Sequence, residues 1–211
     1  MSAVGLGSIV PDPRLAAEVQ MPSPPVSLAA LPVGSTAVYP GQGPCRIGRA
    51  VKKVVDGRVM MFYHLTVLDG RGVELFVPVE KACAIGVRLL MKESEVPELM
   101  AHLRKRAKPA DNWKQRANDN LKLFNSGSAF DLAEVIASLS ELRENKPLSL
   151  GESGTFERAK RLLICEISEV TGEPKAMVEE QVDQVLNEKT AISLIVLNEK
   201  AGISLIDPPT L

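Results

Sequence analysis

The spacing of apolar residues changes once along this chain, near residue 91, and this change determines the fold class. Across residues 31–90 the apolar residues form short β-branched or aromatic runs that alternate with glycine-containing turns, a pattern typical of β-strands. From Glu93 onward they recur every three or four positions, which is typical of amphipathic helices. The sequence therefore predicts an α+β chain in which a β domain (31–90) precedes a helical domain (91–188).

Five runs in the β domain are predicted to be strands: 35–39, 45–54, 58–68, 73–77 and 86–90. The dipeptide Asp56-Gly57 between the second and third runs indicates a hairpin turn, because both residue types tolerate positive φ. So short a segment cannot form a wide sheet, and exposed strand edges invite pairing with other chains. We therefore expect the strands to curl into a small β-barrel, an architecture that often binds a partner.

The helical domain is predicted to be a bundle of about five helices, beginning near residues 94, 112, 128, 149 and 174. Ser149 and Glu152 have the spacing of a capping box, in which each side chain satisfies the other residue's backbone N–H. Asp111 or Asn112 is a plausible N-cap for the second helix, which would place Trp113 in its first turn.

Two flanking segments lie outside these domains. Residues 1–30 are rich in Pro, Ser, Gly and Ala and have no regular apolar spacing, so a disordered extension is predicted. Near the other end, residues 186–195 (LNEKTAISLI) and 197–206 (LNEKAGISLI) almost repeat each other. A hairpin and a helix both fit this repeat, and no function is assigned to the tail (189–211).

The densest positive charge of the chain surrounds its only tryptophan, Trp113. Residues 104–122 contain seven basic and two acidic residues, an excess of five positive charges in a chain whose net charge is −1. Such a cluster attracts nucleic-acid phosphates, and a flat ring among cations can stack on a base or wedge into an opened base step. The alternatives are a tryptophan that packs in a core and a solvated charged helix face. The basic residues are Arg104, Lys105, Arg106, Lys108, Lys114, Arg116 and Lys122.

Several other function classes lack the residues they need. The three cysteines are far apart, and neither His64 nor His102 has a partner at metal-ligand spacing, so no metal site or disulfide framework is predicted. Phosphate-binding loops and nucleophile elbows are missing from the sequence, so we predict neither a cofactor nor an enzyme. No apolar run is long enough to span a bilayer, and we expect a cytoplasmic protein without membrane contact.

The most specific signal is a resemblance that covers roughly residues 31–186. The stretches PVGSTAVYPGQG (32–43), VPVEKACAIGVR (77–88), DNWKQRANDNLKLFNSG (111–127) and DLAEVIASLSELREN (131–145) resemble the CarD/CdnL family of bacterial RNA-polymerase-binding transcription regulators. The resemblance implies a Tudor-like barrel that docks on the polymerase β subunit, followed by a helical domain that meets promoter DNA.

The resemblance also implies roles for single residues. Trp113 would insert at the upstream edge of the melted promoter, and basic residues near it would hold phosphates: Lys114, Arg116, Arg104, Lys105, Arg106 and Lys122. Lys53 matches a basic polymerase contact, whereas Phe76 stands where some members have an arginine. Gln115 and Asn118 make the run after the tryptophan less basic than in other members, so we expect weaker phosphate contact.

The sequence therefore predicts a regulator that stabilises the promoter open complex, is monomeric when free and reaches the nucleoid through polymerase. The alternative is a polymerase- or protein-binding adaptor that does not contact DNA, like the barrel module of transcription-repair coupling factors. A small enzyme is the third possibility, and the scarcity of catalytic residues disfavours it.

Overall fold

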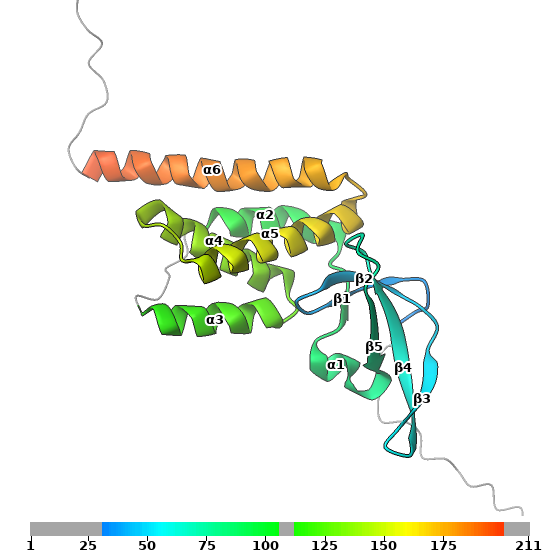
Figure 1. Ribbon diagram of the computed structural model, residues 1–211. Helices are drawn as coiled ribbons and strands as arrows, with labels where there is room; N and C mark the ends of the chain where they lie inside the picture. The colour runs from blue at the N-terminus through cyan, green and yellow to red at the C-terminus, as the bar shows by residue number, and fades with distance from the viewer. Residues whose placement is uncertain (1–30, 106–111, 201–211) are drawn as a thin grey trace, which may run out of the picture. The chain divides into compact units, whose positions relative to one another are not determined.

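The computed structural model describes residues 31–105 and 112–200, with side chains up to residue 189 (Figure 1). The predicted disordered extension (1–30), residues 106–111 with the predicted contact Arg106, and residues 201–211 lie outside the described residues. Within them, an antiparallel sheet is followed by a group of helices, which confirms the predicted α+β class.

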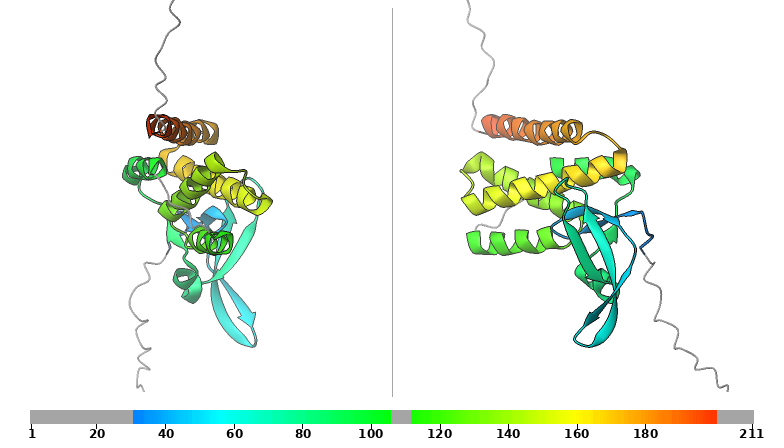
Figure 2. Two further views of the ribbon diagram at one scale, coloured as in Figure 1. Left: turned by 90° about the vertical axis from the view of Figure 1, so that its left-hand side faces the viewer. Right: turned by 45° about the vertical axis from the view of Figure 1, so that its right-hand side comes forward.

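The sheet has six strands among the described residues, and all of their pairings are antiparallel. They are β1 (Thr36–Tyr39), β2 (Gly43–Ile47), β3 (Val51–Val55), β4 (Arg58–Val67), β5 (Glu74–Pro78) and β6 (Arg88–Leu89). The strand order is β3-β4-β2-β1-β6, and β5 also pairs with β4. β3 and β4 form the long hairpin seen in Figure 2, and the turn at Asp56 (φ 50°) and Gly57 (φ 74°) confirms the predicted hairpin signal.

The predicted run 45–54 is divided into β2 and β3, which pair with successive parts of β4. The break begins at Gly48, whose backbone passes close to β4. A Cβ at Gly48 would lie 3.1 Å from the carbonyl oxygen of His64 and equally close to its ring. A glycine here therefore lets the chain bend tightly across the strand it pairs with.

The prediction of a closed barrel is wrong. The strand path ends at β3 and at β6, and these two strands do not pair with each other in the part of the chain that the structure describes. β6 has only two residues, too few to complete a closed ladder, and β3 follows the distal half of β4 instead of turning back. The open edge at β3 bears Lys52 and Lys53, charges that discourage edge-to-edge aggregation.

Six α-helices occur among the described residues, of which the short α1 (Ala82–Ile85) lies between β5 and β6. The other five follow the sheet, so the total exceeds the predicted five by this one helix. They are α2 (Val96–Arg104), α3 (Trp113–Asn125), α4 (Ala129–Asn145), α5 (Leu150–Thr171) and α6 (Lys175–Lys200). Because α6 is continuous to Lys200, the first copy of the repeat is helical and residues 192–197 form no hairpin strand.

α4 is the centre of the helical core. It contacts α2, α3, α5 and α6, and its buried residues lie on all sides of the helix. A helix enclosed in this way is apolar around most of its circumference. The sheet has a separate core, formed by residues that include Ile47, Tyr63, Leu65, Val67 and Val77.

An ion pair between a half-buried arginine and a buried glutamate joins the sheet to the helices. Arg88 of β6 donates two hydrogen bonds to the carboxylate of Glu166 on α5, over 2.7 and 2.9 Å, and a third to the carbonyl of Gly127. Glu166 is only 1% exposed and also accepts the backbone N–H of Met91. Since an uncompensated charge at this depth would be costly, the pair fixes β6 against α5.

Candidate functional site

Trp113 is the first residue of α3, and its side chain faces outward. The side chain of Asn112 accepts the backbone N–H of Lys114 over 2.9 Å, which caps the helix and confirms one of the two predicted N-caps. The indole is 65% exposed, and the Lys114 ammonium lies 5.7 Å from its ring centroid. A core-packed tryptophan, the first alternative, is therefore excluded.

Arg116 lies one turn further along α3 and, unlike Trp113, is buried against α5. Its side chain is 4% exposed, and its guanidinium donates two hydrogen bonds to Glu152 of α5, over 3.0 and 2.7 Å. The predicted phosphate contact at Arg116 does not fit this burial, because the guanidinium already holds a carboxylate inside the protein. The cause is the rotation of α3, which presents this residue to α5 instead of to solvent.

Glu152 belongs to the predicted capping box, which the structure confirms. Its carboxylate accepts the N–H and hydroxyl of Ser149, and its own N–H donates to the Ser149 hydroxyl. Burial alone would raise the pKa of Glu152, but the hydrogen bonds from Ser149 and Arg116 lower it from 4.5 to about 2. The ionised carboxylate thus ties the first turns of α3 and α5 together, and the arginine positions the helix that bears Trp113.

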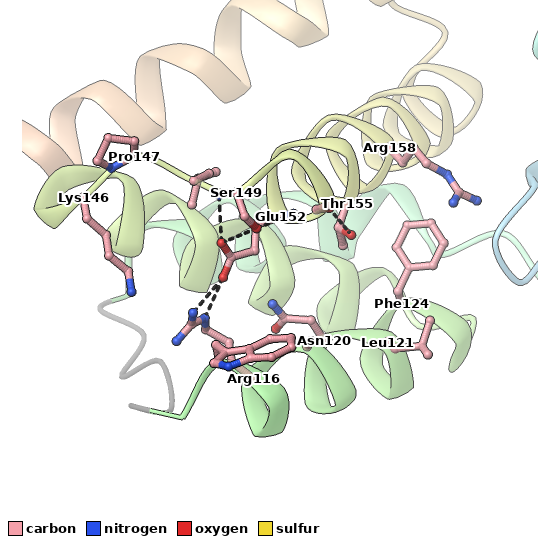
Figure 3. A pocket seen from close by; sticks show the side chains of 14 residues that line it. Arg116, Asn120, Leu121, Phe124, Lys146, Pro147, Ser149, Glu152, Thr155 and Arg158 are labelled. Carbon is pink, nitrogen blue, oxygen red and sulfur yellow. Dashed lines mark hydrogen bonds and ion pairs between the residues drawn. The ribbon is translucent and has the colours of Figure 1, made fainter.

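A groove of about 620 Å³ lies beside this ion pair, between α3 and the beginning of α5. Figure 3 shows Arg116 and Lys146 at one end of it and Phe124 with Arg158 at the other. The groove presents aliphatic and aromatic surface between cations, a combination suited to bases or sugars flanked by phosphates. The lining residues that matter here are Trp113, Asn120, Leu121, Phe124, Lys146 and Arg158.

The other predicted DNA contacts lie on the surface. Lys114 and Lys105 are exposed. The guanidinium of Arg104 lies 3.6 Å from the carboxylate of Glu188, and the ammonium of Lys122 lies 3.9 Å from that of Asp119. These acidic neighbours weaken the positive field of both cations.

The structure brings the two predicted polymerase contacts together. The ammonium of Lys53 on β3 lies 3.1 Å from the ring centroid of Phe76 on β5, although β4 separates their strands. The ring of His64 stacks on Phe76 with centroids 5.0 Å apart. Phe76 is 42% exposed, so the three side chains form one surface of mixed charge and aromatic character.

The opposite face of the β3–β4 hairpin bears an apolar patch that sequence reasoning missed. Val54 and Val59 are paired across the hairpin and are 71% and 68% exposed, and Met61 continues the same face. Residues alternate between faces, so further along β4 this face becomes the buried side of Tyr63 and Leu65. The extension of the apolar pattern of β4 beyond the core was the signal that could have revealed the patch.

Within the described ranges, no three His, Cys, Asp or Glu residues are grouped so that they could hold a metal ion. The same residues include no helix long and apolar enough to cross a membrane.

Two protein-family models match this chain, one for each part of the fold. The model of the CarD-like/TRCF RID domain matches residues 31–88, which contain the sheet. The model of the CarD C-terminal domain matches residues 98–183, which contain most of the helical part.

Proposed function

The chain belongs to the CarD/CdnL family, and on this premise we propose that it is a transcription regulator that docks on RNA polymerase and stabilises the open promoter complex with Trp113. The two matched domains fit a regulator that interacts with RNA polymerase. The finer mechanism rests on one observation: an exposed indole at the end of a helix whose first turn is held by a buried ion pair.

A wedge of this kind acts by replacing lost stacking. An open complex recloses because separated strands regain stacking and pairing. An aromatic ring at the upstream fork compensates with about 1–3 kcal/mol per stacked base. Since about 1.4 kcal/mol is a factor of ten, one ring can lengthen the lifetime of the bubble by roughly one to two orders of magnitude. The gain requires that the indole contact the melted state more favourably than the closed one.

Phosphate contacts would come from the exposed cations near the indole. Lys114 adjoins Trp113, and Lys105, Arg104 and Lys122 add positive charge at the end of α2 and on α3. Such contacts position the protein without reading base sequence. Docking on polymerase would make them intramolecular, so weak affinity for free DNA would suffice.

Docking on the polymerase β subunit is assigned to the surface of Lys53 and Phe76. An ammonium over an exposed ring offers both charge and apolar area to a partner, and β3 beside it is an unpaired edge among the described strands. We expect Lys53→Glu to weaken capture of core polymerase by about tenfold or more without unfolding the helices. Lys81→Glu, an exposed charge reversal outside this surface, is the control. Equal capture by both variants would place the docking surface elsewhere.

The lifetime of the open complex tests the wedge. Trp113→Ala should shorten it by roughly ten- to hundredfold, from the stacking energy above. Met177→Ala removes a comparably exposed apolar side chain from α6 and should leave it unchanged. If Trp113→Ala retains both polymerase capture and a normal lifetime, the protein is the adaptor that does not contact DNA.

A further inference from the structure

A second cavity, of about 220 Å³, lies where the β4–β5 turn meets α5. Three arginines line it, Arg71 from the turn and Arg158 and Arg161 from α5. Among the described residues that line it, the only acidic one is Asp69, which leaves a formal excess of two positive charges (three minus one). We call this cavity the arginine cleft.

Within residues 31–105 and 112–189, two of the three arginines have no carboxylate partner. Asp69 pairs with Arg71, and the hydrogen bonds from Arg71 lower the pKa of Asp69, so Asp69 neutralises only that arginine. Arg158 packs over the ring of Phe124, 5.0 Å from its centroid, and neither it nor Arg161 pairs with an acidic side chain in the described ranges. Lys175 adds a further charge nearby, since its ammonium donates to the carbonyl of Leu68 in the same turn.

The arginine cleft adjoins the groove of Trp113, because Arg158 lines both. Among the lining residues of α5, Thr155, Arg158 and Arg161 follow one another at three-residue spacing, so each lies almost one turn further along the helix and about 60° around it from the last. From Glu152 to Arg161 the helix rises about 14 Å, at about 1.5 Å per residue. In duplex DNA that length corresponds to about four base pairs at about 3.4 Å each.

We propose that the arginine cleft binds the phosphodiester backbone of the DNA duplex that flanks the base step opened by Trp113. The proposal rests on the proposed function and extends it by a second DNA contact that includes the β domain. Guanidinium groups match the geometry of phosphate oxygens. Arg158 and Arg161 have no carboxylate partner in the described ranges and lie one turn apart on one helix, so together they can hold two successive phosphates. A duplex lying along α5 would thus leave the indole at one end of the groove and meet the cleft a few base pairs further on.

Counter-ion release gives a direct measurement. Each phosphate contact contributes about 0.9 to the slope of the logarithm of DNA affinity against the logarithm of salt concentration. Fluorescence anisotropy of the full chain with a forked DNA should show that slope fall by about 1.8 in the double variant Arg158→Gln/Arg161→Gln. Lys81→Gln, which removes one exposed charge elsewhere, should leave it unchanged. The single variant Arg161→Gln should lower it by about 0.9, which keeps the test available should the double variant fail to fold.

The charge of the duplex arm separates this contact from the wedge. On a fork of the same length whose arm carries uncharged methylphosphonate linkages beyond about the second base pair, the wild type should show the reduced slope of the double variant. Trp113→Ala should keep the wild-type slope on the unmodified arm, so loss of the wedge and loss of the cleft contact are distinguishable. An unchanged slope in the double variant overturns the proposal whatever the behaviour of Trp113. Weaker capture of core polymerase by the double variant without DNA also overturns it, because the cleft would then be a polymerase contact.

Discussion

The ion pair between Arg116 and Glu152 offers the sharpest test of how the tryptophan is held. The substitution Glu152→Gln is chosen because glutamine also serves as the third residue of a capping box. With its amide oxygen toward Ser149 it retains the capping box, while the amide nitrogen takes the place of the carboxylate oxygen that faces Arg116. Any loss of stability therefore reports the charge and the hydrogen bonds of the pair with Arg116.

The expected magnitude follows from the pKa of Glu152. A carboxyl group whose pKa falls from 4.5 to about 2 contributes about 3 kcal/mol to folding above pH 4.5. Its side chain is 18% exposed, so solvent reduces the contribution. We therefore expect a loss of about 2 kcal/mol, which for a chain of this size lowers Tm by roughly 4–8 °C at neutral pH.

Thermal unfolding followed by circular dichroism across pH gives the decisive comparison. Because the folded pKa lies below the unfolded one, the stabilisation is complete above about pH 4.5 and is lost as pH falls toward 2. The Tm difference between wild type and Glu152→Gln should shrink over that range. Glu157→Gln removes an exposed charge from the same helix and should cost less than about 0.5 kcal/mol. If Glu152→Gln proves as stable as Glu157→Gln at neutral pH, the positioning role of the pair is refuted.

Two further predictions concern the sheet and its junction with the helices. Gly127→Ala should lower the free energy of unfolding in urea by more than about 2 kcal/mol, because a Cβ there would lie 2.8 Å from the carbonyl oxygen of Gly86. Gly70 has a similar left-handed φ but open space around it, so Gly70→Ala should lower that free energy by only about 1 kcal/mol. Similar losses in both would mean that the close approach is unimportant. Burial raises the pKa of Cys45 to about 11. At about pH 8, iodoacetamide should therefore modify the exposed Cys83 well before the buried Cys45. Mass spectrometry of the native chain after labelling measures the order. Labelling of Cys45 first would contradict its burial.

Local structure was predictable wherever interactions between residues close in sequence determine the backbone conformation. The Asp56-Gly57 turn, the Asn112 cap and the Ser149/Glu152 box each depend on contacts within four residues, and all three are present. The helices then follow from the apolar spacing between such signals. These features set the α+β class without reference to packing.

Features that depend on packing were not predictable in the same way. Arg116 and Lys114 are both cations of one helical turn, and only the rotation of α3 against α5 decides that Arg116 is buried. The closure of the sheet likewise depends on where β3 pairs along β4, which the bend at Gly48 determines. Charge patterns therefore indicated a nucleic-acid surface, but not which of its cations are free to bind phosphate.

In the proposed function, the junction between sheet and helices determines whether docking on polymerase can act on the promoter. If the helical part were flexibly attached to the sheet, docking would stabilise the wedge contact only slightly, because much of the docking free energy would be offset by the cost of ordering the helical part. Here Arg88 and the buried Glu166 join β6 to α5, and α5 in turn holds α3 through Glu152. Each link is an ion pair on a regular element, so in the proposed function the position of the docked sheet would be transmitted through α5 to Trp113. The same helix bears Arg158 and Arg161, and a single rigid element would thus set the spacing between indole, phosphate contacts and polymerase.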